Sequence, residues 1–230
     1  MADTYVIQAG DTLQKIAQQF YGDPSLYKKL ADYDGILNPD LIRINQTIEI
    51  PSRSELEGVI TQPPAPAPGL TPPNGLQGIL NTFGNIFAYI GQDGSLDPRW
   101  VTDQLARAPL PFPIPLSWDP SKGVTNFYCH VKLVDVFPRV FAAIQQQGLK
   151  HRIKTFGGCF NFRSKRTSGK LSTHSWGIAI DLNPDSNPQG ASGDMDSGVI
   201  EVFHQFGFTW GGDWTGVSKD PMHFQFCSGY

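Results

Sequence analysis

The sequence has few cysteines, little net charge and no long apolar run, and each of these absences argues against a class of protein. The only cysteines among the 230 residues are Cys129, Cys159 and Cys227, and no two of them form a Cys-x-x-Cys pair. We expect free buried thiols, with a single disulfide as the alternative. The formal net charge of −3 argues against a nucleic-acid partner bound by bulk electrostatics. No stretch approaches the ~20 apolar residues of a membrane span, so we expect no membrane partner.

The first residues of the sequence do not have the pattern of a leader segment, so we expect none. The longest apolar run there is Tyr5-Val6-Ile7, and no charged segment precedes it. We therefore expect a protein that is made in the cytoplasm without an export signal. Hydrophobic residues make up 40% of the chain, which is enough for a core, and the length predicts one or two domains.

Proline and glycine, in contrast, are abundant, with 19 and 24 residues, and six of the thirteen residues at 61–73 are proline. Such a run favours extended polyproline II structure and acts as a semi-rigid spacer. We therefore predict a first domain at 1–51, a Pro-rich linker at 52–75 and a second domain at 97–230. Between them, 76–96 is predicted to be a short helical segment that docks on the second domain, with partner binding as the alternative.

The first domain carries the pattern of a small βααβ unit. Residues 4–8 alternate as in a strand, and 13–20 place apolar side chains at helical spacing after Asp11 or Thr12 as N-cap. Asp23-Pro24 starts a second helix. The closing strand is predicted from four isoleucines, Ile42, Ile44, Ile48 and Ile50.

Within this unit, Tyr5-x-Ile7-x-x-Gly10-Asp11-Thr12-Leu13, Asn38-Pro39-Asp40 and Ile48-x-Ile50-Pro51 resemble a LysM domain over residues 3–51. The resemblance implies a groove for glycans that contain N-acetylglucosamine, between the loop after the first strand and the loop after the second helix. Its substrate-binding residues map onto Gly10, Asp11, Thr12, Asp34 and Gly35. Many glycan-binding members carry Asn-Gly where this chain has Asp34-Gly35, so an assembly or docking module is the alternative.

The second domain has mixed α/β patterning. An amphipathic helix is predicted over 134–144, and 151–156 is predicted to be a strand. Residues 178–183 alternate so that Asp181 points away from the buried face. Residues 223–226 alternate in the same way, with His223 and Gln225 on one side. Together these segments predict an α+β domain.

Two histidines and an aspartate, His174, Asp181 and His223, are thereby expected on one polar face. Imidazoles and a carboxylate suit Zn²⁺ and leave a fourth position for water, whose pKa the metal lowers. Asp220, three residues before His223, is then placed to act as a general base. On this spacing alone, ordinary polar residues remain the alternative.

Longer motifs strengthen the metal hypothesis. They are Phe162-Arg163-Ser164, Ser172-x-His174-x-x-Gly177-x-Ala179-x-Asp181, Gly211-Gly212-Asp213-Trp214 and Asp220-Pro221-Met222-His223-Phe224. Over residues 97–228 these motifs resemble the zinc D-alanyl-D-alanine carboxypeptidase superfamily, in particular the phage-type L-alanyl-D-glutamate endopeptidases. The resemblance implies an α+β peptidase domain with a central antiparallel sheet. It also implies that His174, Asp181 and His223 bind zinc, that Asp220 is the base, that Arg163 steadies the oxyanion, and that Ser172 contacts substrate.

Other polar residues receive structural expectations. His130, His151 and His204 are expected to be packed or at the surface, and Asp213 with Trp214 is expected to shape the floor of the site. Between Val136 and Ile180 there are eight lysines and arginines and no acidic residue. This basic stretch favours anionic wall polymers or peptide carboxylates, with a solvated surface as the alternative.

Together these features predict a zinc-dependent peptidoglycan peptide hydrolase whose LysM domain targets the cell wall. Its partners would be stem peptides and glycan, and it would act after lysis or while carried on a phage-like particle. The bond cleaved would be L-Ala-D-Glu or D-Ala-D-Ala. The alternatives are a structural or cargo component docked through the LysM domain to a phage tail or contractile-injection-type assembly, and a non-catalytic metal-binding relative.

Overall fold

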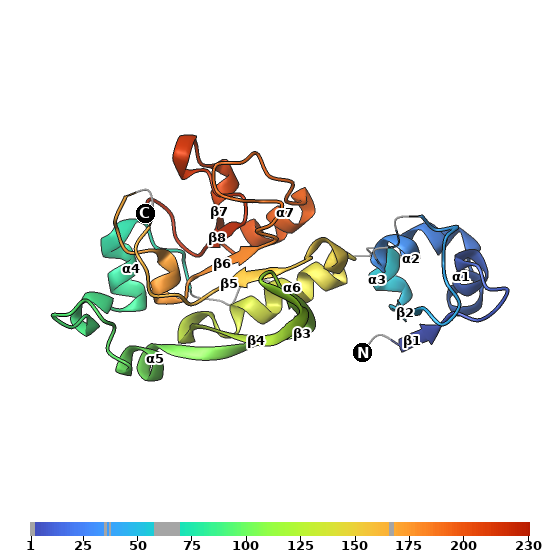
Figure 1. Ribbon diagram of the computed structural model, residues 1–230, viewed down its shortest axis with the longest axis horizontal. Coiled ribbons are helices and arrows are strands. Elements are labelled where there is room, and N and C mark those ends of the chain that lie inside the picture. The colour runs from blue at the N-terminus through green and yellow to red at the C-terminus, as the bar shows by residue number, and fades with distance from the viewer. Residues whose placement is uncertain (1–2, 35, 37, 58–69, 166–167) are drawn as a thin grey trace. The chain divides into compact units, whose positions relative to one another are not determined.

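The computed structural model describes residues 3–34, 36, 38–57, 70–165 and 168–230 (Figure 1). The backbone divides into two compact units, one that contains residues 3–57 together with 143–152 and one that contains 70–142 and 153–230. Half of the predicted Pro-rich spacer at 52–75 lies outside the described residues, so its extended conformation there stays a prediction. The prediction is wrong for the start of the spacer, where Arg53–Glu57 form a helix. Within the described part of the chain, no helix is both long and apolar enough to cross a membrane.

The small unit has the predicted βααβ order. Its elements are β1 (Asp3–Val6), α1 (Leu13–Tyr21), the 3-10 turn η1 (Pro24–Leu26), α2 (Tyr27–Tyr33) and β2 (Thr47–Ile50), followed by α3 (Arg53–Glu57). The two strands pair antiparallel, with Tyr5 opposite Ile48. Apolar side chains of both helices and β2 fill the core, among them Ile16, Leu30 and Ile48, each at most 1% exposed.

The boundaries of these elements have local causes. The Thr12 hydroxyl accepts a hydrogen bond from Lys15 N at 3.2 Å and caps α1, which ends at Gly22 in the left-handed region. The predicted closing strand was too long, because the chain still turns at Asn45, whose φ is 67°. Ile42 and Ile44 therefore lie before β2, and Ile44 is 60% exposed.

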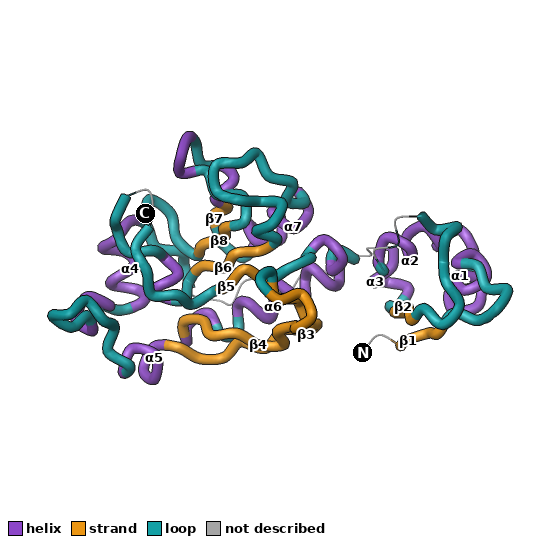
Figure 2. Tube along the Cα trace, viewed as in Figure 1, coloured by secondary structure: helices purple, strands orange, loops and turns teal. Residues whose placement is uncertain are grey.

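The chain after residue 70 forms a six-stranded sheet with surrounding helices (Figure 2). Its helices and 3-10 turns are α4 (Gly75–Phe83), η2 (Ile86–Tyr89), α5 (Arg99–Gln104), η3 (Val131–Leu133), α6 (Val136–Gln146), η4 (Lys150–Arg152), η5 (Thr173–Trp176), α7 (Ser197–Gln205), η6 (Gly211–Asp213) and η7 (Gly216–Ser218). Its strands are β3 (Leu105–Leu116), β4 (Asp119–His130), β5 (Phe156–Gly158), β6 (Ala179–Leu182), β7 (Thr209–Trp210) and β8 (His223–Gln225). These elements confirm the α+β class.

The sheet has the order β4-β3-β5-β6-β8-β7. Its neighbours pair antiparallel except β3 and β5, which are parallel and meet at Leu116 and Phe156. The sheet is therefore mixed at this one junction and antiparallel around β6 and β8, where the candidate ligands lie.

A long hairpin, β3 and β4, was not predicted from the sequence. Strand β3 carries prolines at every second position from 109 to 115, and all of them are exposed, whereas Ala108, Phe112 and Ile114 point inward. Proline is tolerated in a strand where its missing N–H is not needed for the ladder. The strand predicted at 151–156 is wrong for its first residues, because Arg152 N bonds to Leu149 O and closes a 3-10 turn.

An aromatic core fills the space between the sheet and helices α6 and α7. Phe137 of α6 packs against Phe127 of β4, with ring centroids 5.1 Å apart. Phe203 of α7 stacks on Phe224 of β8 at 4.1 Å. Because side chains alternate along a strand, the residues that flank Phe224 in β8 face the opposite side of the sheet.

The predicted docking segment packs within the large unit. Ile79, Phe83 and Ile86 are fully buried, and the Gly84 carbonyl accepts a hydrogen bond from Trp176 Nε1 at 3.1 Å. All three cysteines are free and buried, as expected.

Candidate metal centre

Strand pairing brings the first two candidate ligands together. Asp181 in β6 lies directly opposite His223 in β8, and cross-strand neighbours share one face of a sheet. Ile180 and Phe224, the pair next to them, are fully buried on the other face. As a result His223 Nδ1 lies 3.0 Å from Asp181 Oδ1.

His174 reaches the same point from the 3-10 turn η5. Ser172 begins this turn, and its hydroxyl accepts a hydrogen bond from His174 N at 3.4 Å. The turn ends at Gly177, where φ is +67° and a Cβ would lie 2.9 Å from His130 N, so a glycine is required there. Ser172 lines the pocket but is buried, so the structure gives it a positioning role and its substrate contact stays a prediction.

The three ligand atoms converge closely. His174 Nε2 lies 3.2 Å from Asp181 Oδ1 and 3.1 Å from His223 Nδ1. Four-coordinate zinc with bonds of about 2.1 Å places its ligand atoms roughly 3.4 Å apart, which is close to these separations. Among the described residues these three side chains form the one cluster of this kind.

Hydrogen bonds behind the imidazoles set which nitrogen faces the cluster. His174 Nδ1 lies 2.6 Å from the Cys159 carbonyl oxygen and must carry a hydrogen to bond it, which leaves Nε2 free to bind a cation. Gln225 donates its amide N–H to the carbonyls of Cys227 and Tyr230, so its Oε1 faces His223 Nε2 at 3.1 Å. His223 Nε2–H is therefore the donor, and Nδ1 is free.

Lone pairs of two nitrogens and one carboxylate thus point at one small volume, and this arrangement could hold a cation. Burial would raise the pKa of Asp181, but the two imidazoles hold it well below its usual range. For His174, burial lowers the pKa, yet the Asp181 carboxylate outweighs this and raises it. A proton and a metal ion therefore compete for the same site, and the donor set fits Zn²⁺.

Asp220 is held beside this cluster by backbone contacts. Its N–H donates to Gly211 O at 2.9 Å, and a Cβ on Gly211 would lie 2.5 Å from Asp220 O. The Asp220 carboxylate lines the pocket, and its buried Oδ1 has no hydrogen-bond partner among the described residues. Burial raises the pKa of Asp220 to about 6, against the lowering effect of His223. A carboxylate of this kind is suited to accept a proton near neutral pH.

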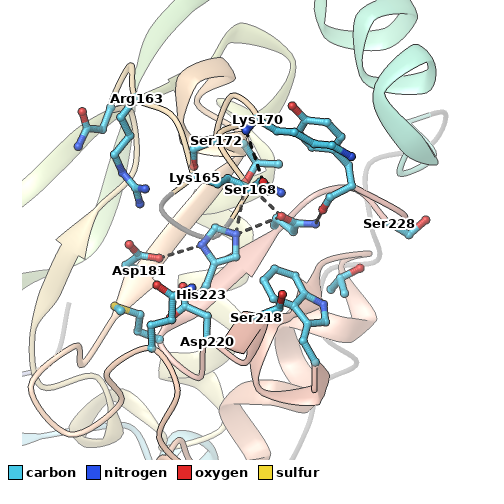
Figure 3. Close-up of a pocket in the computed structure, with 18 of the residues that line it drawn as sticks. Arg163, Lys165, Ser168, Lys170, Ser172, Asp181, Ser218, Asp220, His223 and Ser228 are labelled. Carbon is cyan, nitrogen blue, oxygen red and sulfur yellow. Dashed lines mark hydrogen bonds and ion pairs between the residues drawn. The ribbon is translucent and has the colours of Figure 1, made fainter. Parts of the chain in front are cut away.

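The cluster opens into a groove of about 930 Å³ (Figure 3). A second hollow of about 380 Å³, lined by Trp118 and Phe160 among others, shares Asn161, Arg163 and Asp181 with it. The exposed Arg163 is fixed through its backbone, since its N–H donates to Ser175 Oγ at 3.1 Å and its carbonyl accepts from Ser172 N at 2.8 Å. Its guanidinium is therefore available at both hollows.

The remaining polar and aromatic residues of interest differ in whether they line the groove. Trp214 lines the groove, with its ring centroid 5.5 Å from that of His223. The expectation of a floor role does not hold for Asp213, whose side chain is 62% exposed and lies 3.9 Å from His204. His130 is packed, as expected: its Nε2 lies 3.0 Å from Phe83 O, and burial lowers its pKa to about 4.

The residues that orient the ligands were missed at the level of sequence. Gln225 was placed on the polar face of its strand but received no role. Thr173 precedes His174 in the motif, and its hydroxyl lies 3.3 Å from His223 Nε2 and donates to Gln225 Oε1 at 3.1 Å. Gln225 lies two residues after His223, so both side chains face the same side of the strand, and this spacing could have indicated the contact between them.

In the small unit, the predicted glycan-binding residues of the first loop shape that loop. Asp11 Oδ2 accepts hydrogen bonds from the Tyr5 hydroxyl at 2.9 Å and from Gln8 N at 2.7 Å. Gly10 has φ +87°, and Thr12 caps α1. Their contact with glycan stays a prediction.

Asp34 lies at the end of α2, and its Oδ1 accepts a hydrogen bond from Glu49 N at 2.8 Å. This bond ties α2 to β2, so an aspartate at this position has a role within the fold itself. Gly35 lies outside the described residues, and its glycan contact stays a prediction.

Models of two known protein families match separate parts of the chain. A LysM domain model matches residues 5–51, and a family described as D-alanyl-D-alanine carboxypeptidase matches residues 165–226. The second match contains the three-ligand cluster and Asp220, whereas Arg163 lies just before it.

Individual relatives are similar over short stretches. An uncharacterized protein of Deinococcus radiodurans is 51% identical over 47 residues, which are 20% of this chain and 19% of that protein. Two esterases of Mycobacterium tuberculosis are 39% identical over 51 residues, which are 22% of this chain and 11% of theirs. The chain thus spans a small part of the length of these relatives, and no solved structure matches it significantly. From the family matches, the chain carries a LysM domain at residues 5–51 and, at residues 165–226, a peptidase domain of the D-alanyl-D-alanine carboxypeptidase family.

Proposed function

We propose that this protein is a zinc-dependent peptidase that cleaves amide bonds in the stem peptides of peptidoglycan. The observation that carries the proposal is the convergence of three lone pairs, from His174, Asp181 and His223, in an open groove beside Asp220. A carboxypeptidase-family domain joined to a LysM domain supports peptidoglycan as the substrate. The bond cleaved is of the L-Ala-D-Glu or D-Ala-D-Ala type.

The three-ligand cluster would hold the zinc ion. When bound there, zinc supplies Lewis acidity, which lowers the pKa of a water molecule and polarises a carbonyl group. Gln225 and the Cys159 carbonyl keep the two imidazoles in the tautomers that such binding requires.

Asp220 and Arg163 provide the remaining chemistry. The Asp220 carboxylate, which lines the groove, accepts the proton of the attacking water and later passes it to the leaving amine. The exposed guanidinium of Arg163 stabilises the negative charge that develops on the carbonyl oxygen.

The LysM domain would hold the enzyme on the glycan strands. The alternative, docking to a phage tail or contractile-injection-type assembly, receives no support from the comparisons. The departure that suggested it, Asp34, is accounted for by its hydrogen bond to Glu49 N.

Digestion of purified sacculi, followed by mass spectrometry of the released muropeptides, tests the proposal. The zinc-loaded protein should release products cut within the stem peptide, and EDTA or His174→Ala should abolish them. His204→Ala, at a partly exposed histidine outside the cluster, is the matched control and should retain activity. Equal release by the His174→Ala protein would refute the proposed centre.

A further inference from the structure

The groove continues beyond the metal cluster to a basic end. Lys165, Lys170 and Tyr230 line the same hollow as Asp181 and His223. In Figure 3, Lys165 and Lys170 lie on one side of His223 and Asp220 lies on the other. These side chains therefore line the same groove as the metal cluster.

Lys165 is held in place rather than free at the surface. Its backbone N–H bonds to Lys170 O, and an isolated β-bridge joins the neighbouring residues Ser164 and Leu171. Its ammonium lies 4.4 Å from the centroid of the Tyr230 ring. That ring is fixed in turn, because the Tyr230 hydroxyl donates to Leu171 O at 2.8 Å. Lys165 thus presents a positioned cation that is half-buried in the groove wall.

Among the described residues, no carboxylate forms an ion pair with this cation. The sequence has no acidic residue between Val136 and Ile180. Burial lowers the pKa of Lys165, and the nearby Lys170 acts in the same direction. A partly desolvated charge without a counter-charge is costly unless a ligand supplies one.

We propose that Lys165 is a specificity residue that binds a carboxylate of the stem peptide whose amide bond lies at the metal cluster. This inference rests on the proposed function, because it states which group of the substrate the proposed peptidase recognises. Stem peptides offer such a carboxylate at two places, the α-carboxyl of the γ-linked D-glutamate and the carboxyl terminus. Both groups are carboxylates, which the basic end of the groove would bind, and the experiment shows which of the two is bound.

The test measures binding of four synthetic peptides by calorimetry. The probe is L-alanyl-γ-D-glutamyl-L-lysyl-D-alanine, used with both carboxyls free, with either one amidated, or with both amidated. Zinc-loaded protein that carries Asp220→Asn serves as the slow parent, so that binding is read without turnover. One of the two single amidations should weaken binding by about 10- to 100-fold, the usual worth of a hydrogen bond to a charged group.

Single substitutions then test whether Lys165 causes the preference for the free carboxylate. Lys165→Gln in the same parent should bind the free and amidated peptides equally, and Lys165→Arg should restore the preference. Lys122→Gln is the matched control, since that lysine is 73% exposed and pairs with Asp119 outside the groove. It should leave the preference unchanged.

Several outcomes overturn the inference. The first is a preference for the free carboxylate that survives Lys165→Gln, and the second is a preference that disappears with Lys170→Gln alone. The third is equal affinity of the parent for all four peptides, and the fourth is no binding of any peptide at millimolar concentration. Failure of the proposed function is read separately, as absence of hydrolysis by the protein with Asp220 intact. Charge-dependent binding without hydrolysis would refute the peptidase and leave the carboxylate site standing.

Discussion

Replacement of Asp220 by asparagine should make the metal-free protein more stable while it removes most of the activity. One oxygen of this partly buried carboxylate has no hydrogen-bond partner among the described residues. Burial raises the pKa of Asp220 from 3.8 to about 6, although His223 lowers it. The folded state is therefore penalised whenever Asp220 is charged, and asparagine carries no charge.

The size of the gain follows from the linkage between protonation and folding. A rise of the pKa from 3.8 to about 6 corresponds to a loss of about 3 kcal/mol in the free energy of unfolding, since each pKa unit is worth about 1.4 kcal/mol. Because the group is partly exposed, solvent screening reduces this to about 1–2 kcal/mol, or about 2–8 °C in melting temperature. The folded pKa is the higher one, so the penalty is absent below about pH 4, grows between pH 4 and 6, and is complete above that.

Thermal unfolding in EDTA between pH 4 and pH 8 measures the effect, since a bound cation beside the carboxylate would offset the penalty. Asp213→Asn is the matched control, because that side chain is 62% exposed, and it should change neither stability nor activity. In the zinc-loaded protein, Asp220→Asn should lower turnover by about 10²–10⁴-fold. An unchanged or lower melting temperature at pH 8, or an equal gain at pH 4, would refute the reasoning.

Three further predictions concern the metal, the residues behind it and the LysM domain. Elemental analysis should find one zinc per chain, and the double variant His174→Ala with His223→Ala should lose it; stoichiometric zinc in that variant would contradict the assignment. Gln225→Leu removes the acceptor of His223 Nε2–H and should weaken zinc binding by about 10–100-fold in competition with a chelator, whereas unchanged affinity would rule out its orienting role. Deletion of residues 1–60 should leave hydrolysis of soluble muropeptides nearly unchanged and reduce hydrolysis of intact sacculi, because the LysM domain acts through effective concentration; equal activity on sacculi would exclude wall targeting.

Local patterns in the sequence predicted several of the elements and the identity of the candidate ligands, although they missed the hairpin of β3 and β4. The helical spacing and caps of α1 predicted that helix, because capping depends on neighbours a few residues apart. Period-two alternation placed Asp181 and His223 on the polar faces of their strands. The motif residues by themselves indicated both families, LysM at residues 5–51 and D-alanyl-D-alanine carboxypeptidase at residues 165–226.

Tertiary structure alone decided how these parts act together. The convergence of His174 with His223, which lies 49 residues further along the chain, depends on contacts between distant segments. So do the tautomers set by Cys159 O and Gln225 and the pKa of Asp220. Local propensity carries no information about them, and it also misjudged β3, whose prolines are tolerated because they fall on an exposed face. The chain therefore encodes its ligands locally, whereas their geometry, their protonation and the placement of the Lys165 cation arise only from long-range packing.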